Sequence, residues 1–388
     1  MGKLSCIVLI SAVALLGALH DAAAIWPFDD KIVVDTSLGK VKGRITDDKK
    51  VAVFHDVPFG RPPVGDYRLR SALPVDPWTD TKDCSSAKPL TMCKQELKGI
   101  VVGDEDCLYL HIYTPTTTPD EPLPVMFWIF GGAYTMGDGY ELDLYNGNNL
   151  ASEHNAVVVA ANYRVGSLGF LALNALQETD PSHITGNYGL TDQLRAMEWV
   201  QHHISNFGGD PSRVTIFGES AGAFSVCAHI ASPLSSGLFH SAIMESTTCV
   251  SSNFFRDLPH SNAFGLEMAA AVGCENETEV VECLQKVDVD KLVKVELPPY
   301  TGSGIDQRIV PPLYGSMDWG TVIDGVFLLD VPLSVMERGE HNQVPIIIGM
   351  NKDEGTLLLP DMAAPIGNGV KYPFNTKDTL IGLHQLFH

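Results

Sequence analysis

Basic residues are scarce in this sequence. Of its 388 residues, 26 are lysine or arginine and 47 are aspartate or glutamate, so the formal net charge is −21. Nucleic acid, itself a polyanion, repels a chain of this charge, and a nucleic-acid partner is therefore not expected. The acidic excess favours solubility and by itself does not indicate a cationic substrate.

Long apolar runs are also missing after the N-terminal segment, so no later segment is expected to cross a bilayer. The sequence has no repeat of about 20–50 residues and no low-complexity tract, which argues against a solenoid and against a disordered chain. Hydrophobic residues make up 45% of the chain and charged residues 19%. Such a composition can bury a large core, and α/β enzymes reach this length as one compact unit.

The N-terminus has the features of a secretory signal peptide. Lys3 provides the positive end, Leu4 to Leu19 the apolar stretch, and Ala22-Ala23-Ala24 a small-residue cleavage site. A membrane anchor is the alternative, but the apolar run is short and a cleavage site follows it. Residues 1–24 are therefore expected to be a signal peptide, and the protein to be secreted or to lie in the lumen of the secretory pathway.

Cysteine is sparse, with eight residues in all, and Cys6 falls within the signal peptide, which leaves seven. Secretion permits disulfides. Because seven is odd, at least one cysteine is expected to be free or to pair outside this sequence.

Apolar runs and helical segments alternate along the chain. Four runs lack the alternation of a half-exposed strand and predict buried strands of a parallel sheet: PVMFWIF (124–130), AVVVAANY (156–163), RVTIF (213–217) and PIIIGM (345–350). Helical segments such as Leu190–His203 and Ala221–Ala231 lie between them, so a mainly parallel α/β sheet is expected. Residues 31–45 predict two short strands around the turn Ser37-Leu38-Gly39.

One of these runs leads directly into a GxSxG motif. RVTIF continues as Gly218-Glu219-Ser220-Ala221-Gly222, and an apolar helical segment follows. In this context the glycines permit a tight turn that exposes the serine Oγ above the sheet, and the helix adds N–H groups and a positive dipole end. A Gly-rich packing turn is the alternative, but the flanking strand and helix favour Ser220 as a nucleophile.

A serine nucleophile needs donors for the oxyanion, an oriented acid and a base. Gly131-Gly132-Ala133 follows the strand at 124–130, so Gly132, Ala133 and Ala221 are the expected donors, unless this is an ordinary Gly-Gly turn.

The acid is expected after a later strand. Asp353 and Glu354 both follow PIIIGM and are both candidates, whereas Asp324 is weaker because no apolar run leads into it. A solvated acidic turn is the alternative.

Together these features resemble the type-B carboxylesterase/lipase family, which includes carboxylesterases, cholinesterases, bile-salt-activated lipases and the non-catalytic neuroligins. FGGDPSRVTIFGESAG resembles its serine signature and EDCLYLHIYTP its second signature. Its other landmarks are matched in order by VPFGRPPVGDYR, WIFGGAY, NYRVGSLGF, GNYGLTDQ and NKDEG. The resemblance runs from about Val33 to Gly355.

The resemblance implies an α/β-hydrolase fold over residues 25–388, with a mostly parallel central sheet and helices on both faces. It assigns Ser220 as nucleophile and Glu354 as triad acid, supports the oxyanion donors named above, and implies two buried ion pairs, Arg68 with Glu105 and Arg164 with Asp192.

The resemblance also bears on the cysteines. It pairs Cys274 with Cys283 and Cys107 with Cys93, with Cys84 as the competing partner of Cys107. It leaves Cys84, Cys227 and Cys249 unplaced. The sequon Asn276-Glu277-Thr278 falls inside the Cys274–Cys283 loop, which suits a glycosylated surface loop.

Three residues depart from the family pattern. Cholinesterases carry a tryptophan ten residues before the cysteine of EDCLYL, where it holds a quaternary ammonium, but here the position is Leu97 and no tryptophan lies between Trp78 and Trp128. Ala133 replaces the third oxyanion glycine, as in bile-salt-activated lipases. His111 replaces a small polar residue of the second signature.

The largest departure from the family pattern concerns the histidines. Family members continue well past the acid to their triad histidine, but only His384 and His388 follow Glu354, and neither has a histidine–glycine context. The chain is therefore expected to be incomplete at its C-terminus and to lack the catalytic base. His202 and His203 are predicted on the surface of the helix before the serine motif.

The sequence thus predicts a secreted serine hydrolase that cleaves carboxylic esters through an acyl-enzyme on Ser220. The expected substrate is a small neutral ester or lipid, and neither metal nor cofactor is expected. The alternative is a non-catalytic, cholinesterase-like adhesion or storage module. Retention of Ser220, Gly132 and Glu354 argues against that alternative, whereas a natural truncation would favour it. The sequence carries no signal of the oligomeric state.

Overall fold

The computed structural model describes residues 31–247, 249, 255–276, 279–295 and 319–354. Several predicted features lie outside these residues: the signal peptide at 1–24, Glu277 and Thr278 of the sequon, Gly355, and the histidines His384 and His388. None of the described helices is long and apolar enough to span a bilayer.

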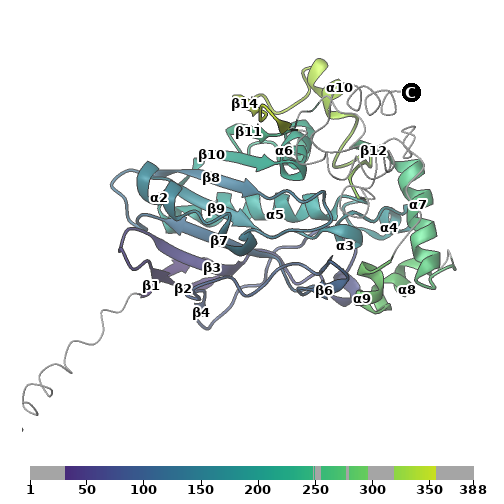
Figure 1. Ribbon diagram of the computed structural model, residues 1–388, viewed down its shortest axis with the longest axis horizontal. Coiled ribbons are helices and arrows are strands. Elements are labelled where there is room, and N and C mark those ends of the chain that lie inside the picture. Colours follow the sequence, from purple (N-terminus) through teal and green to yellow (C-terminus); the bar gives the residue numbers. More distant parts are fainter. Residues whose placement is uncertain (1–30, 248, 250–254, 277–278, 296–318, 355–388) are drawn as a thin grey trace, which may run out of the picture.

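Strands and helices alternate over most of the described chain (Figure 1). The strands are β1 (Lys31–Thr36), β2 (Gly39–Ile45), β3 (Ala52–Pro58), β4 (Lys82–Asp83), β5 (Gln95–Leu97), β6 (Ile100–Val102), β7 (Tyr109–Thr114), β8 (Leu123–Ile129), β9 (Val157–Ala161), β10 (Gly209–Glu219), β11 (Ser241–Glu245), β12 (Phe255–Asp257), β13 (Thr321–Ile323) and β14 (Ile346–Gly349). The helices are α2 (Asn148–His154), α3 (Gly166–Phe170), α4 (Asn174–Thr179), α5 (Tyr188–His203), α6 (Ala221–Ala231), α7 (Leu258–Ala271), α8 (Val280–Lys286), α9 (Val289–Val293) and α10 (Pro332–Glu337).

One large sheet organises the described residues. Its strand order is β1-β2-β3-β7-β9-β8-β10-β11-β14, with β4 beside β2. Neighbours are antiparallel from β1 to β9 and parallel from β9 through β8, β10 and β11 to β14. The predicted α/β-hydrolase fold is confirmed, and the parallel half is the half that carries the GxSxG motif. The hairpin predicted at residues 31–45 is formed by β1 and β2.

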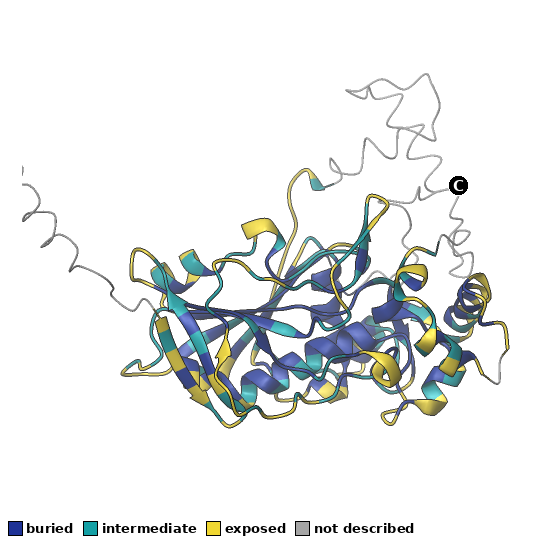
Figure 2. Ribbon diagram, turned by 90° about the horizontal axis from the view of Figure 1, so that it is seen from below, coloured by how far each residue is buried: buried dark blue, intermediate teal, exposed yellow. Residues whose placement is uncertain are grey.

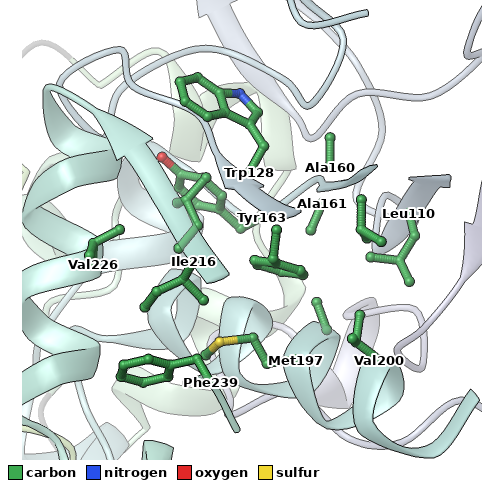
Figure 3. Packing of buried hydrophobic residues seen from close by; sticks show 14 of the residues in the cluster. Leu110, Trp128, Ala160, Ala161, Tyr163, Met197, Val200, Ile216, Val226 and Phe239 are labelled. Atoms are coloured by element: carbon green, nitrogen blue, oxygen red, sulfur yellow. The ribbon is translucent and has the colours of Figure 1, made fainter. Parts of the chain in front are cut away.

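The two faces of the sheet are covered by different helices, because successive strand residues point to opposite sides. On one face, Met197 and Val200 of α5 and Val226 of α6 pack in one cluster with Ile216 and other strand residues (Figure 3). On the other face, Val158 packs against Ala151 of α2. Burying each such large apolar side chain stabilises the fold by about 1.5–3 kcal/mol. Figure 2 shows the buried residues in the interior and the exposed residues at the periphery.

Of the four predicted buried strands, the run at 156–163 is buried throughout and the run at 124–130 is largely buried. In the run at 213–217 only Val214 and Ile216 are buried, and Arg213 is exposed. The prediction for residues 345–350 is wrong in part. A strand, β14, does form there and pairs with β11, yet Ile347 is 64% exposed and its neighbours Ile346 and Ile348 are exposed too. The continuous apolar pattern is typical of a strand covered on both faces. Within the described residues β14 is the outermost strand, and no described element covers its faces.

Disulfides join three pairs of described cysteines. Cys93–Cys107 and Cys274–Cys283 are the pairs that the family resemblance implies, and Cys227–Cys249 joins two of the cysteines that the sequence left unplaced. Cys84 is buried and free.

Both ion pairs implied by the resemblance are formed. Arg68 Nε lies 2.6 Å from Glu105 Oε1, and Arg164 Nη2 lies 2.7 Å from Asp192 Oδ1.

Candidate active site

The GxSxG motif forms a sharp turn between β10 and α6. Ser220 has φ 54° and ψ −120°, a backbone conformation that a residue with a side chain rarely adopts. Its N–H donates to the carbonyl of Glu245 at 3.0 Å. The flanking glycines permit a close approach of β8, since a Cβ on Gly222 would lie 2.1 Å from Ile129 O and one on Gly218 2.7 Å from the same atom. The turn therefore depends on the two glycines that the motif supplies.

A second turn, at residues 131–137, lies directly against Ser220. A Cβ placed on Gly131 would lie 3.3 Å from Ser220 Cβ and 2.9 Å from Glu219 Oε2. Gly132 and Ala133 both have positive φ, at 100° and 55°. Within the described residues neither N–H donates to any acceptor. The first turn of α6, which begins at Ala221, has no side-chain cap, so its N–H groups lack intrahelical partners as well.

Of the three candidate acids, Glu354 and Asp353 follow β14 and Asp324 does not. Glu354 Oε2 accepts from the N–H of Asn351 at 3.2 Å, whereas its Oε1 is shielded from solvent and has no donor among the described residues. Hydrogen bonding to Ser246 and then to Asn351 lowers the pKa of Glu354, so it is ionised at neutral pH. Asp353 is exposed.

Asp324 has a structural role. It follows β13, which pairs only with β12 in a separate small sheet. Its Oδ1 accepts from the backbone N–H groups of Val326, Phe327 and Leu328. The carboxylate thus caps a turn, and the structure does not bring it to the Ser220 turn.

Two polar residues at the site were missed by the sequence reasoning. Glu219, inside the motif, has a raised pKa because of burial and then of the nearby carboxylates of Glu354, Glu245 and Glu141. Ser246 has φ 58° and accepts from Asn351 Nδ2 at 3.4 Å. The position of Glu219 next to the serine was a visible signal, whereas no local pattern marks Ser246.

No described histidine is hydrogen-bonded to Ser220, whose hydroxyl has no partner in the described part of the chain. His202 is exposed, as predicted. The surface prediction for His203 is wrong: the residue is buried, with its ring centroid 5.1 Å from that of Trp199. Positions four apart on a helix share a face, and this face of α5 points into the core.

Two of the residues that depart from the family pattern, Leu97 and His111, lie in defined elements of the structure. Leu97 pairs with Ile100 in the hairpin of β5 and β6. This hairpin is tied to the 131–137 turn, because the side-chain amide of Gln95 donates to Gly137 O at 2.9 Å and accepts from its N–H at 2.8 Å. His111 is fully buried beside His55, with ring centroids 5.6 Å apart, and burial lowers its pKa to about 3.

The site's segments all fall within one family match. The model of the carboxylesterase family matches residues 30–381. The chain belongs to the carboxylesterase family. It is 38% identical over 362 residues to liver carboxylesterase B-1 of Rattus norvegicus, covering 87% of this chain and 62% of the relative. It is also 38% identical over 365 residues to liver carboxylesterase of Sus scrofa, covering 87% and 61% respectively.

Solved carboxylesterase-family structures share the fold. The crystal structure of the carboxylesterase EST55 of Geobacillus stearothermophilus at pH 6.8 superposes with a TM-score of 0.72 at 31% identity, covering 87% of this chain and 66% of that one. A PNB esterase gives a TM-score of 0.72 at 32% identity, covering 91% and 68%. The chain spans about three fifths of the length of the liver carboxylesterases it matches, 62% and 61%.

Proposed function

We propose that this protein is a serine hydrolase that cleaves small neutral carboxylic esters or lipids through an acyl-enzyme on Ser220. The observation that carries the proposal is the strained Ser220, packed against a turn whose Gly132 and Ala133 N–H groups have no described acceptor. A binding or storage module needs neither the strain nor the unpaired donors. The relatives' names as carboxylesterases support the same reaction class.

In the proposed reaction, Ser220 Oγ attacks the ester carbonyl while a general base accepts the hydroxyl proton. The N–H groups of Gly132, Ala133 and Ala221 stabilise the negative oxygen, and each such donor contributes about 10²–10³ in rate. The bond to the alcohol breaks, the alcohol leaves with the proton, and an acyl-serine remains. Water then attacks the acyl group and releases the carboxylic acid. Glu354, one of whose oxygens has no donor among the described residues, would orient the base.

We also propose that residues 25–388 form one hydrolase domain. Residues 1–24 act as a signal peptide that directs the protein into the secretory pathway and is then removed. Asn276 is proposed to be glycosylated there. The disulfides Cys93–Cys107, Cys227–Cys249 and Cys274–Cys283 support an oxidising compartment. Asn276 is exposed, as an acceptor must be. Mass spectrometry of the secreted protein tests the N-terminus and the glycan together.

Glu354→Gln should lower kcat far more than Asp353→Asn. Glu354 has a shielded carboxylate oxygen with no donor in the described part of the chain, whereas Asp353 is an exposed residue of the same turn. Replacing a triad acid by its amide lowers kcat by about 10⁴. Both variants are made in the full-length protein and assayed on an uncharged ester. A larger loss of kcat in Asp353→Asn would reverse the assignment.

Acetylcholine should not be a preferred substrate. A quaternary ammonium is held by an aromatic face, worth about 0.5–2 kcal/mol, and the candidate position carries Leu97. The matched comparison is 3,3-dimethylbutyl acetate, which has the same shape without the charge. We expect kcat/KM for the neutral ester to equal or exceed that for acetylcholine, and a tenfold preference for acetylcholine would contradict the proposal.

A further inference from the structure

The turn that faces Ser220 contains two consecutive strained residues that are not glycine. Ala133 has φ 55° and Tyr134 has φ 58°. Residues with a Cβ adopt this left-handed conformation only when surrounding contacts hold them there. Ala133 provides one of the proposed oxyanion donors, so whatever holds its neighbour Tyr134 also holds the direction of that N–H.

Tyr134 is held at three points. Its side chain is 2% exposed, and its ring lies 4.5 Å from that of Phe170, centroid to centroid. Its carbonyl accepts from the N–H of Gly166 at 2.6 Å. Its hydroxyl accepts from Ser225 Oγ of α6 at 3.2 Å. The first two contacts belong to the ring and the backbone, and only the third needs the phenol oxygen.

The bond from Ser225 ends a chain of buried hydrogen bonds between α5 and α6. Gln193 Nε2 donates to Ser225 Oγ at 3.1 Å, and Gln193 Oε1 lies 3.0 Å from His229 Nε2. His229 Nδ1 lies 2.8 Å from Ser235 Oγ. Gln193, Ser225, His229 and Ser235 are all fully buried.

The direction of this chain is determined by its chemistry. Gln193 Oε1 is an acceptor, so His229 Nε2 carries the hydrogen and Nδ1 accepts from Ser235. Burial lowers the pKa of His229 to about 3, and the ring is therefore neutral at physiological pH. Gln193 then presents its N–H to Ser225, and the Ser225 hydroxyl turns its hydrogen to Tyr134. In this arrangement the Ser225 hydroxyl accepts from Gln193 and donates to Tyr134, and the phenol oxygen is the acceptor of the last bond in the chain.

We propose that Tyr134 is a positioning residue for the proposed hydrolysis: its hydroxyl, anchored through Ser225 and Gln193, holds the 131–137 turn so that the Gly132 and Ala133 N–H groups face the oxyanion. This inference rests on the proposed function. Removal of the hydroxyl leaves the ring in place but leaves the Ser225 hydroxyl without its acceptor, and the strained turn is released at one of its three points. The donors then spend part of the time misaligned.

The test compares Tyr134→Phe, Ser225→Ala and the double variant in the full-length protein. Loss of one oxyanion donor lowers kcat by about 10²–10³, and partial misalignment should lower it by about tenfold with KM unchanged. Affinity for a trifluoromethyl ketone, whose adduct carries the oxyanion, should fall by the same factor. Because the two residues act through one bond, the double variant should lose no more than the more damaging single variant.

Tyr188→Phe is the matched control. Tyr188 is also fully buried, and the partner of its hydroxyl within the described residues is Thr185 Oγ1, at 3.4 Å. This variant should keep the wild-type kcat. An equal loss in Tyr188→Phe, or an unchanged kcat in Tyr134→Phe, would overturn the proposal.

Hydrogen exchange separates this proposal from the proposed function. The N–H groups of Thr135 and Met136 donate to Gly132 O, so their exchange reports on the turn without any turnover. Exchange should be faster in Tyr134→Phe and Ser225→Ala than in the wild type and in Tyr188→Phe. If the wild type hydrolyses no ester, the proposed function is wrong, but hydrogen exchange still tests whether the Tyr134 hydroxyl holds the turn. Unchanged exchange in Tyr134→Phe would refute the positioning role.

Discussion

Ser220→Ala should reduce ester turnover by about six orders of magnitude, the loss typical when the nucleophile of a serine hydrolase is removed. The reason is that Ser220 stands on a strained turn that packs directly against the 131–137 turn, which contains the proposed donors Gly132 and Ala133. Turnover of an uncharged ester measures the loss. A fluorophosphonate probe, which forms a covalent adduct with an activated serine, should label the wild type and not the variant.

Ser236→Ala serves as the control, because Ser236 is exposed and lies beyond the end of α6. It should be labelled and should turn over substrate as the wild type does. Mapping the adduct by mass spectrometry completes the experiment. An adduct on another serine, or equal labelling of Ser220→Ala, would show that the nucleophile has been misassigned.

Asp192→Asn should cost about 3–5 kcal/mol of the free energy of unfolding, the typical effect of removing one charge from a buried pair. Asp192 is fully buried and Arg164 nearly so, at 0% and 3% side-chain exposure. Asp192 accepts from the backbone N–H of Arg164 and from its Nε and Nη2, at 2.9, 2.8 and 2.7 Å. The variant leaves the guanidinium buried without its counter-charge. Urea unfolding followed by circular dichroism measures the change.

Glu282→Gln is the contrasting variant. Its partner Lys286 lies one turn along α8, and both side chains are largely exposed, so solvent screens their attraction. The urea midpoint of Glu282→Gln should stay close to that of the wild type. Similar shifts for both variants would mean that burial of the Arg164–Asp192 pair contributes nothing special to stability.

These residues also show where local sequence patterns were sufficient. The strand, the glycines and the helix around Ser220 are contiguous, and each has its own local signal, so the turn could be predicted from one stretch of sequence. The same holds for the hairpin of β1 and β2. For residues 345–350 the strand was predicted correctly but its burial was not. An apolar run indicates a strand, but it does not show whether other elements cover the faces of that strand.

Contacts between distant segments could not be read from local patterns. His203 was placed on the surface because its helix was visible but the direction of the helix face was not. Cys227 and Cys249 pair because α6 and the segment after β11 pack together, which cysteine spacing alone cannot show. Ser246 reaches the site because β11 and β14 are neighbours in the sheet, although Asn351, its partner, is 105 residues away.

The fold class, the family, the Ser220 turn and its candidate donors could all be predicted from the amino-acid sequence, because each depends on short-range backbone geometry or on a motif of consecutive residues. The packed chain was needed to show which carboxylate has a shielded oxygen, that His203 is buried, and that Cys227 pairs with Cys249. It was also needed to show that Tyr134 is tied through Ser225 to Gln193 and His229. The physical reason is that burial and hydrogen-bond partnership are properties of the packed chain, and they are set when helices and strands far apart in sequence meet.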